Sequence, residues 1–109
     1  MELPYRYVAN LANELPDIPP DSIVSRSVSN EQGVTATLFG FATGQEMSEH
    51  TSSYPAILHF LQGEAELMLR GERRLAQAGT WVFMPPHTPH SVLAKTTVVM
   101  LLLLFRGQS

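Results

Sequence analysis

The chain contains no cysteine among its 109 residues. Disulfide bonds, thiolate catalysis and cysteine-based zinc sites are therefore excluded. Basic residues are also scarce, with seven Lys and Arg against ten Asp and Glu and a net charge of -3. This balance offers no basic surface for nucleic acid or an anionic membrane, so we expect neither partner.

Long apolar runs are absent as well. The longest, residues 98–105, has eight residues, whereas a membrane-spanning helix needs about 20. The first ten residues, MELPYRYVAN, have neither the basic region nor the apolar region of a secretion signal. We therefore expect a cytoplasmic protein, and the length favours a single domain.

Helical spacing occurs once, near the start of the chain. Apolar side chains from Tyr5 to Leu15 recur at helical intervals and end at Pro16, which predicts a short helix over residues 5–15. Residues 16–21, PDIPPD, are expected to form an extended linker. We accordingly divide the chain into an N-terminal helical segment with linker, residues 1–21, and a barrel, residues 22–109.

The rest of the chain consists of short runs rich in Val, Thr, Phe and Leu, separated by Gly- and Pro-containing turns. This pattern predicts an all-β antiparallel sandwich or barrel. The expected strands are residues 22–28, 33–41, 47–52, 56–61, 65–69, 73–76, 80–84, 90–94 and 97–105.

The last expected strand contains VVMLLLLF and is apolar at both its even-numbered and its odd-numbered positions. A strand with one solvated face would alternate, so both of its faces need cover. The barrel interior covers one, and either residues 5–15 or a second chain covers the other. We favour a homodimer that buries this face or adds an edge strand at SIVSRSVS.

Two of the four histidines stand where a strand meets a Gly or Pro turn. His50 lies at a strand end in GQEMSEHTSSYPA, and His90 begins a strand after PPHTP. In an antiparallel barrel, such positions can meet at one mouth. No Gly-rich phosphate loop and no Ser-His-Asp pattern is visible.

These residues carry a resemblance to a small single-domain RmlC-like cupin of the conserved-barrel type. Its first motif is matched by Gly44, five residues, His50 and the later LQGEAEL, and its second by Gly79, Pro85 and His90. The resemblance spans about residues 33–105. It implies a double-stranded β-helix, or jelly-roll barrel, preceded here by the short N-terminal helix.

The resemblance also implies a metal site, which this chain retains only in part. Metal-binding cupins usually offer two histidines, a Glu or Gln, and a third histidine. Here Ser52 stands at the second histidine position and Ala56 at the acidic one, leaving His50 and His90. Catalytic metal sites usually have three protein ligands, so a divalent metal (Zn, Ni, Fe or Mn) is the less favoured expectation, with His87 as the candidate third ligand.

Strand parity suggests an apolar ligand pocket at the same mouth. For any single member of this set, ordinary core filling is the favoured interpretation, and the pocket is inferred from the group. The expected lining is His50, Ser52, Ala56, Leu58, Phe60, His90, Met47 and Met84.

The other polar residues have more ordinary interpretations. His87 is three residues from His90, so alternation places the two on opposite faces and favours a surface turn role for His87. Alternation likewise directs His59 to an outer face or a subunit contact. Glu46 and Glu49 are expected to be solvated.

Three classes of function remain open at this point. The favoured one is a binding module that holds a small organic molecule beside a degenerate metal site. The second is an enzyme, either a metal-dependent dioxygenase or isomerase using His50, His90 and His87, or a metal-free acid–base catalyst. The third is an interaction protein with a filled barrel, and the ligand itself is not specified by the sequence.

Overall fold

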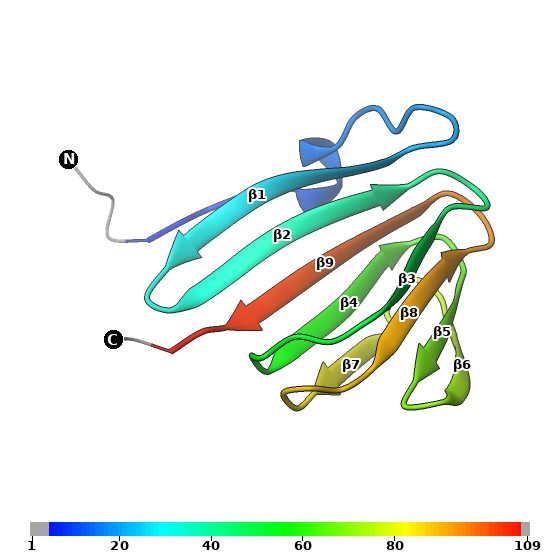
Figure 1. Ribbon diagram of the computed structural model, residues 1–109. Coiled ribbons are helices and arrows are strands. Elements are labelled where there is room, and N and C mark those ends of the chain that lie inside the picture. Colours follow the sequence, from blue (N-terminus) through cyan, green and yellow to red (C-terminus); the bar gives the residue numbers. More distant parts are fainter. Residues whose placement is uncertain (1–4, 108–109) are drawn as a thin grey trace.

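The computed structural model describes residues 5–107. It contains nine strands in two antiparallel sheets that face each other as a barrel (Figure 1). The five-stranded sheet has the order β1-β2-β9-β4-β7, and the four-stranded sheet has the order β3-β8-β5-β6. The strands are β1 Ile23–Glu31, β2 Val34–Phe41, β3 Glu46–His50, β4 Ala56–Gln62, β5 Ala65–Leu69, β6 Glu72–Ala76, β7 Trp81–Met84, β8 His90–Ala94 and β9 Val98–Phe105.

This architecture confirms the predicted all-β jelly roll, and each predicted strand is present within a few residues. No helix within residues 5–107 is long and apolar enough to cross a membrane.

The prediction of a helix over residues 5–15 is wrong in the extent and in the type of the helix. Only a single 3₁₀ turn, η1 Leu11–Glu14, forms there. Asn10 caps it by accepting a hydrogen bond from the Ala12 amide at 3.0 Å. Leu15 has already left the helical region, with φ -126° and ψ 76°, and a residue before proline is disfavoured in that region. Only five residues lie between the Asn10 cap and Pro16, and helices this short are not stable on their own.

The core lies between the two sheets. It is built from alternate residues of the strands, because side chains of a strand point to opposite faces. Its nearly solvent-free members include Phe41, Leu58, Phe60, Leu67 and Met100. Thus Val98, Met100, Leu102 and Leu104 of β9 face inward, and the odd-numbered residues of β9 face outward.

The N-terminal segment covers part of the outer face of the five-stranded sheet. A Cβ on Gly40 would lie 2.7 Å from Ile18 Cδ1 and 3.2 Å from Leu15 Cδ1. The segment is also tied by an ion pair between Arg26 of β1 and Glu14, at 3.4 Å. Gly40 therefore permits a close approach that a larger residue would prevent.

Candidate functional site

His50 and His90 are brought together by the pairing of β3 with β8. They are direct cross-strand partners in this ladder, and their ring centroids lie 4.2 Å apart with an interplanar angle of 53°. A register shift between Met47 and His50 precedes the contact. Two residues that are forty positions apart in the sequence thus form one imidazole pair at the end of the barrel.

The proton position on each imidazole is set by the backbone. Nδ1 of His50 lies 2.7 Å from the Ser48 carbonyl oxygen, and Nδ1 of His90 lies 2.8 Å from the Thr88 carbonyl oxygen. A carbonyl oxygen only accepts hydrogen bonds, so each Nδ1 carries the proton and donates it. In the neutral ring, Nε2 is then left as an unprotonated acceptor.

His90 is held neutral near pH 7 by its surroundings. Its residue is only 6% exposed, and desolvation is the largest influence, lowering the pKa of the imidazole. The hydrogen bond to the Thr88 carbonyl opposes this and raises the pKa, while the charge on His50 lowers it further. His50 itself is exposed to solvent.

Nε2 of His90 remains accessible although the residue is buried. Within residues 5–107, no buried side-chain nitrogen or oxygen is left without a hydrogen-bond partner. The hydrogen bond of the His90 ring runs through Nδ1. Its Nε2 is therefore not fully enclosed by the protein.

Ser52 and His87 belong to the turns beside this pair. The Ser52 hydroxyl accepts a hydrogen bond from the Tyr54 amide at 3.0 Å, and the Ser52 carbonyl accepts one from the His87 amide at 2.7 Å. His87 is exposed and has a φ of 65°, a turn conformation that few non-glycine residues adopt. Both residues thus have structural roles in joining the 50s loop to the proline turn.

The donor set does not fit a metal centre of three protein ligands. Among residues 5–107, no three His, Asp or Glu side chains are grouped closely enough to hold a metal ion. The Ser52 hydroxyl is engaged in its own turn, and Ala56 offers no donor. The predicted involvement of His50, His90 and His87 in metal binding stays a prediction, and no catalytic step is derived from a metal here.

The apolar residues expected to line a pocket are core residues in this structure. Ala56, Leu58, Phe60 and Met84 are 1–3% exposed and belong to the main core cluster, and Met47 packs against it. Their role in contacting a ligand stays a prediction. Glu46 and Glu49 are exposed, as expected for solvated carboxylates.

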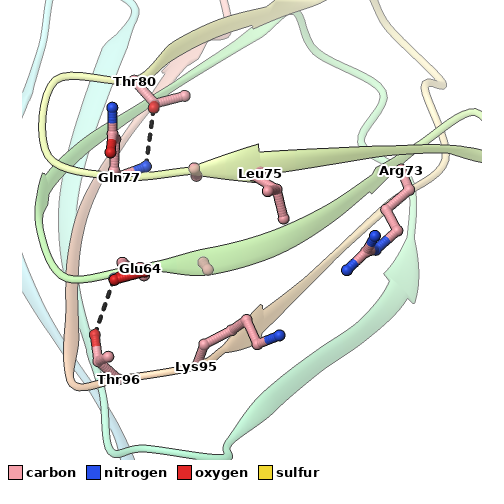
Figure 2. Close-up of a pocket in the computed structure, with 9 residues that line it drawn as sticks. Glu64, Arg73, Leu75, Gln77, Thr80, Lys95 and Thr96 are labelled. Carbon is pink, nitrogen blue, oxygen red and sulfur yellow. Dashed lines mark hydrogen bonds between the residues drawn. The ribbon is translucent and has the colours of Figure 1, made fainter.

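A cavity that the sequence did not predict lies at the opposite end of the barrel. It measures about 660 Å³ and is formed where β5 and β7 begin and β6 and β8 end. Figure 2 shows Arg73 at one end of it and Thr80 and Thr96 toward the other, with Lys95 next to Thr96 and its side chain extending toward Arg73. The residues come from three separate loops and the adjoining strand ends. Strand parity predicts only which face of a strand a side chain lies on, so it could not predict that these loops come together.

The polar groups of this cavity are mostly engaged with one another. Arg73 pairs with Glu66 at 2.9 Å, and this hydrogen bond, aided by the charges of Arg73 and Lys95, lowers the pKa of the Glu66 carboxyl. The Thr96 hydroxyl accepts from the Glu64 amide and the Thr80 hydroxyl from the Gln77 amide (Figure 2), each at 2.9 Å. These contacts brace the loops of this barrel end.

Comparison with known proteins agrees with this architecture. A family model described as a cupin domain matches residues 37–105. No curated protein matches the chain significantly.

Solved structures extend the likeness over nearly the whole chain. A conserved protein of unknown function from Streptococcus pyogenes is 28% identical with a TM-score of 0.84, covering 98% of this chain and 93% of its own. A cupin superfamily protein from Desulfitobacterium hafniense is 23% identical with a TM-score of 0.83, covering 94% of each chain. KdgF from Halomonas sp. is 26% identical with a TM-score of 0.71, covering 77% of this chain and 79% of its own. With the family model matched over more than half of its length, the chain belongs to the cupin family.

Proposed function

We propose that this cupin binds a small organic molecule at the His50–His90 end of the barrel without a resident metal. The fixed tautomers of the two imidazoles carry the proposal. Both Nδ1 protons are donated to backbone carbonyls, so each ring in its neutral form presents Nε2 as a hydrogen-bond acceptor. The matching ligand carries hydrogen-bond donors, such as the hydroxyl groups of a polyol, a phenol or a hydroxy acid.

The surroundings of the pair favour such a ligand over a metal ion. Three-ligand coordination is not available from the described side chains, whereas an accessible Nε2 in a desolvated environment strengthens a hydrogen bond to a ligand. The neutral state of His90 supports the same interaction, because a protonated imidazole would donate from Nε2 instead.

A second candidate function is metal-free proton transfer at the same site. The lowered pKa of His90 keeps its Nε2 able to accept a proton near neutral pH. The proton would move from a ligand hydroxyl or carbon acid to Nε2, while Nδ1 keeps its bond to Thr88. Some solved cupin relatives bear the names of enzymes, including a DMSP lyase from Ruegeria pomeroyi, but at 24% identity this likeness shows the fold alone.

Binding is tested with the chelator-treated protein and a panel of polyols, phenols and hydroxy acids, measured by saturation-transfer NMR. At least one compound class is expected to bind. His50→Ala and His90→Ala should each weaken this binding at least tenfold, and His87→Ala, the matched control on the neighbouring turn, should leave it unchanged.

Two results would contradict the proposal. One is that no compound binds without added metal, while zinc or nickel restores binding. The other is that binding survives in both His50→Ala and His90→Ala. The first would favour the metal-dependent alternative, and the second would place the ligand elsewhere on the molecule.

A further inference from the structure

The cavity at the end of the barrel away from His50 and His90 has the size of a ligand site. Its volume of about 660 Å³ lies within the roughly 300–1,000 Å³ of small-molecule sites in proteins. Its lining comes from β6, from the start of β5 and from the turns that follow β4, β6 and β8. Neither His50 nor His90 is part of this lining, so the cavity is a separate feature of the molecule.

Two cationic side chains approach each other in this cavity. The side chain of Lys95 extends toward Arg73 (Figure 2). Arg73 donates one N–H to Glu66 at 2.9 Å, which leaves further N–H groups of its guanidinium to bind a second acceptor. Across the described residues, 5–107, no carboxylate forms a salt bridge with the Lys95 ammonium.

The effect of these cations is visible on a carboxylate of the protein itself. The hydrogen bond from Arg73, and after it the charges of Arg73 and Lys95, lower the pKa of the Glu66 carboxyl, although burial acts in the opposite direction. Glu66 compensates the charge of Arg73 by direct pairing, whereas Lys95 keeps its charge uncompensated. This end of the cavity therefore favours one further negative charge.

An apolar surface and a carboxylate complete the lining. Leu75 lies two residues from Arg73 on β6, so the two side chains share a face of the strand. Leu75 is 67% exposed and offers an apolar surface that a ligand can cover. Glu64 lies near Thr96, at the end of the cavity away from Arg73 (Figure 2). A second negative charge on a ligand would be repelled there.

We propose that this cavity binds a small organic acid that has a single carboxylate and an apolar body. The carboxylate accepts hydrogen bonds from Lys95 and Arg73, and the apolar body covers Leu75. One negative charge matches the uncompensated charge of Lys95, and Glu64 selects against a second carboxylate. The site differs in chemistry from the imidazole pair, which offers acceptor nitrogens instead of cationic donors.

The test is a titration of the ¹⁵N-labelled protein with sodium benzoate at low ionic strength, followed by ¹H–¹⁵N NMR. The backbone amides of Gln77, Lys95 and Thr96 should shift, and those of His50 and His90 should stay in place. Added salt should weaken the binding, because the cations are exposed.

Three further probes separate the contributions of charge and apolar surface. Benzamide has the shape of benzoate without its charge and should bind several-fold more weakly. Acetate lacks the apolar body and should also bind more weakly. Terephthalate carries a second carboxylate, which Glu64 should repel, so it too should bind more weakly than benzoate.

Lys95→Met and Arg73→Met should each weaken benzoate binding about threefold, because single ion pairs at exposed sites are weak. The double variant should lose the preference for benzoate over benzamide. Arg74→Met is the matched control, because Arg74 is also an exposed residue of β6 with an ion pair, to Glu72 at 3.2 Å, but lies outside the cavity lining. Its binding of benzoate should equal that of the unmodified protein.

Equal binding of benzoate and benzamide would overturn the proposal, and so would benzoate binding that is unchanged in both Lys95→Met and Arg73→Met. The absence of shifts in the cavity amides, or shifts confined to the His50–His90 end, would overturn it as well, without deciding whether polyols, phenols or hydroxy acids bind at that end. Circular dichroism verifies that each variant is folded. Should a variant fail to fold, the comparison of benzoate with benzamide on the unmodified protein decides the question alone.

Discussion

Gly63 stands in the turn between β4 and β5 and has a φ of +86°. A Cβ at this position would overlap the Thr97 carbonyl oxygen and lie 2.9 Å from Thr96 Oγ1. We expect Gly63→Ala to be far more costly than a glycine substitution in an open turn, because the loop before β9 would have to move.

Gly71, in the β5–β6 turn, is the matched control. Its φ is +81°, and a Cβ there would meet nothing within 4 Å. Alanine in the left-handed region costs about 1–2 kcal/mol, partly offset by about 0.4–1 kcal/mol from the reduced entropy of the unfolded chain. Gly71→Ala should thus lower the free energy of unfolding by about 1 kcal/mol.

Gly63→Ala adds the displacement of hydrogen-bonded loops to the same backbone cost. The Glu64 amide donates to Thr96 Oγ1 at 2.9 Å, and the Glu64 carbonyl accepts from the Lys95 amide at 2.8 Å. At about 0.5–1.5 kcal/mol for each bond lost, the total reaches about 3 kcal/mol. For a domain of this size that corresponds to a fall in Tm of about 15 °C, against about 5 °C for Gly71→Ala.

Thermal and urea unfolding followed by circular dichroism measures both values. Equal losses of stability in Gly63→Ala and Gly71→Ala would refute the close packing of the turn at Gly63 against the turn at Thr97. The closure of the barrel at this end would then be refuted as well.

Three further results are expected. Burial lowers the pKa of His90 in the folded state, so below the usual histidine pKa of about 6.5 the unfolded chain binds more protons than the folded one. The free energy of unfolding should therefore fall as the pH drops from about 6.5 through the pKa of folded His90. Urea unfolding of His90→Gln should show a smaller fall, and an equal dependence on pH in both proteins would contradict His90 as the cause. Phe60→Ala removes a side chain that is 1% exposed and should cost about 3–5 kcal/mol in the same assay; a loss under about 1 kcal/mol would contradict its place in the core. Arg73→Met breaks an ion pair of the exposed surface and should change the free energy of unfolding by less than about 1 kcal/mol. A larger loss would contradict the view that this ion pair contributes little to stability.

The strand pattern of this protein is readable from its sequence because Gly- and Pro-containing turns separate runs with a high preference for strands. The same turns placed His50 and His90 at strand ends, and the family motif linked them across forty residues. Their pairing in the β3–β8 ladder is the structural counterpart of that spacing.

Other features depend on contacts that no local pattern encodes. The helical spacing of residues 5–15 is real, but Asn10 and Pro16 leave room for one 3₁₀ turn, and the tertiary contacts of Leu15 and Ile18 with Gly40 fix the segment instead. The imidazole tautomers likewise depend on the Ser48 and Thr88 carbonyls, whose directions follow from the folded turns.

The most direct test of the two-imidazole site is long-range ¹H–¹⁵N NMR of the chelator-treated protein with labelled histidine. In the pH range where the rings are neutral, His50 and His90 should each show a protonated Nδ1 and an unprotonated Nε2. Addition of a bound polyol, phenol or hydroxy acid should shift the Nε2 signals of this pair and leave those of His59 and His87 in place. A proton on Nε2 of either residue, or Nε2 signals that respond to zinc but to none of these compounds, would contradict the proposed metal-free site.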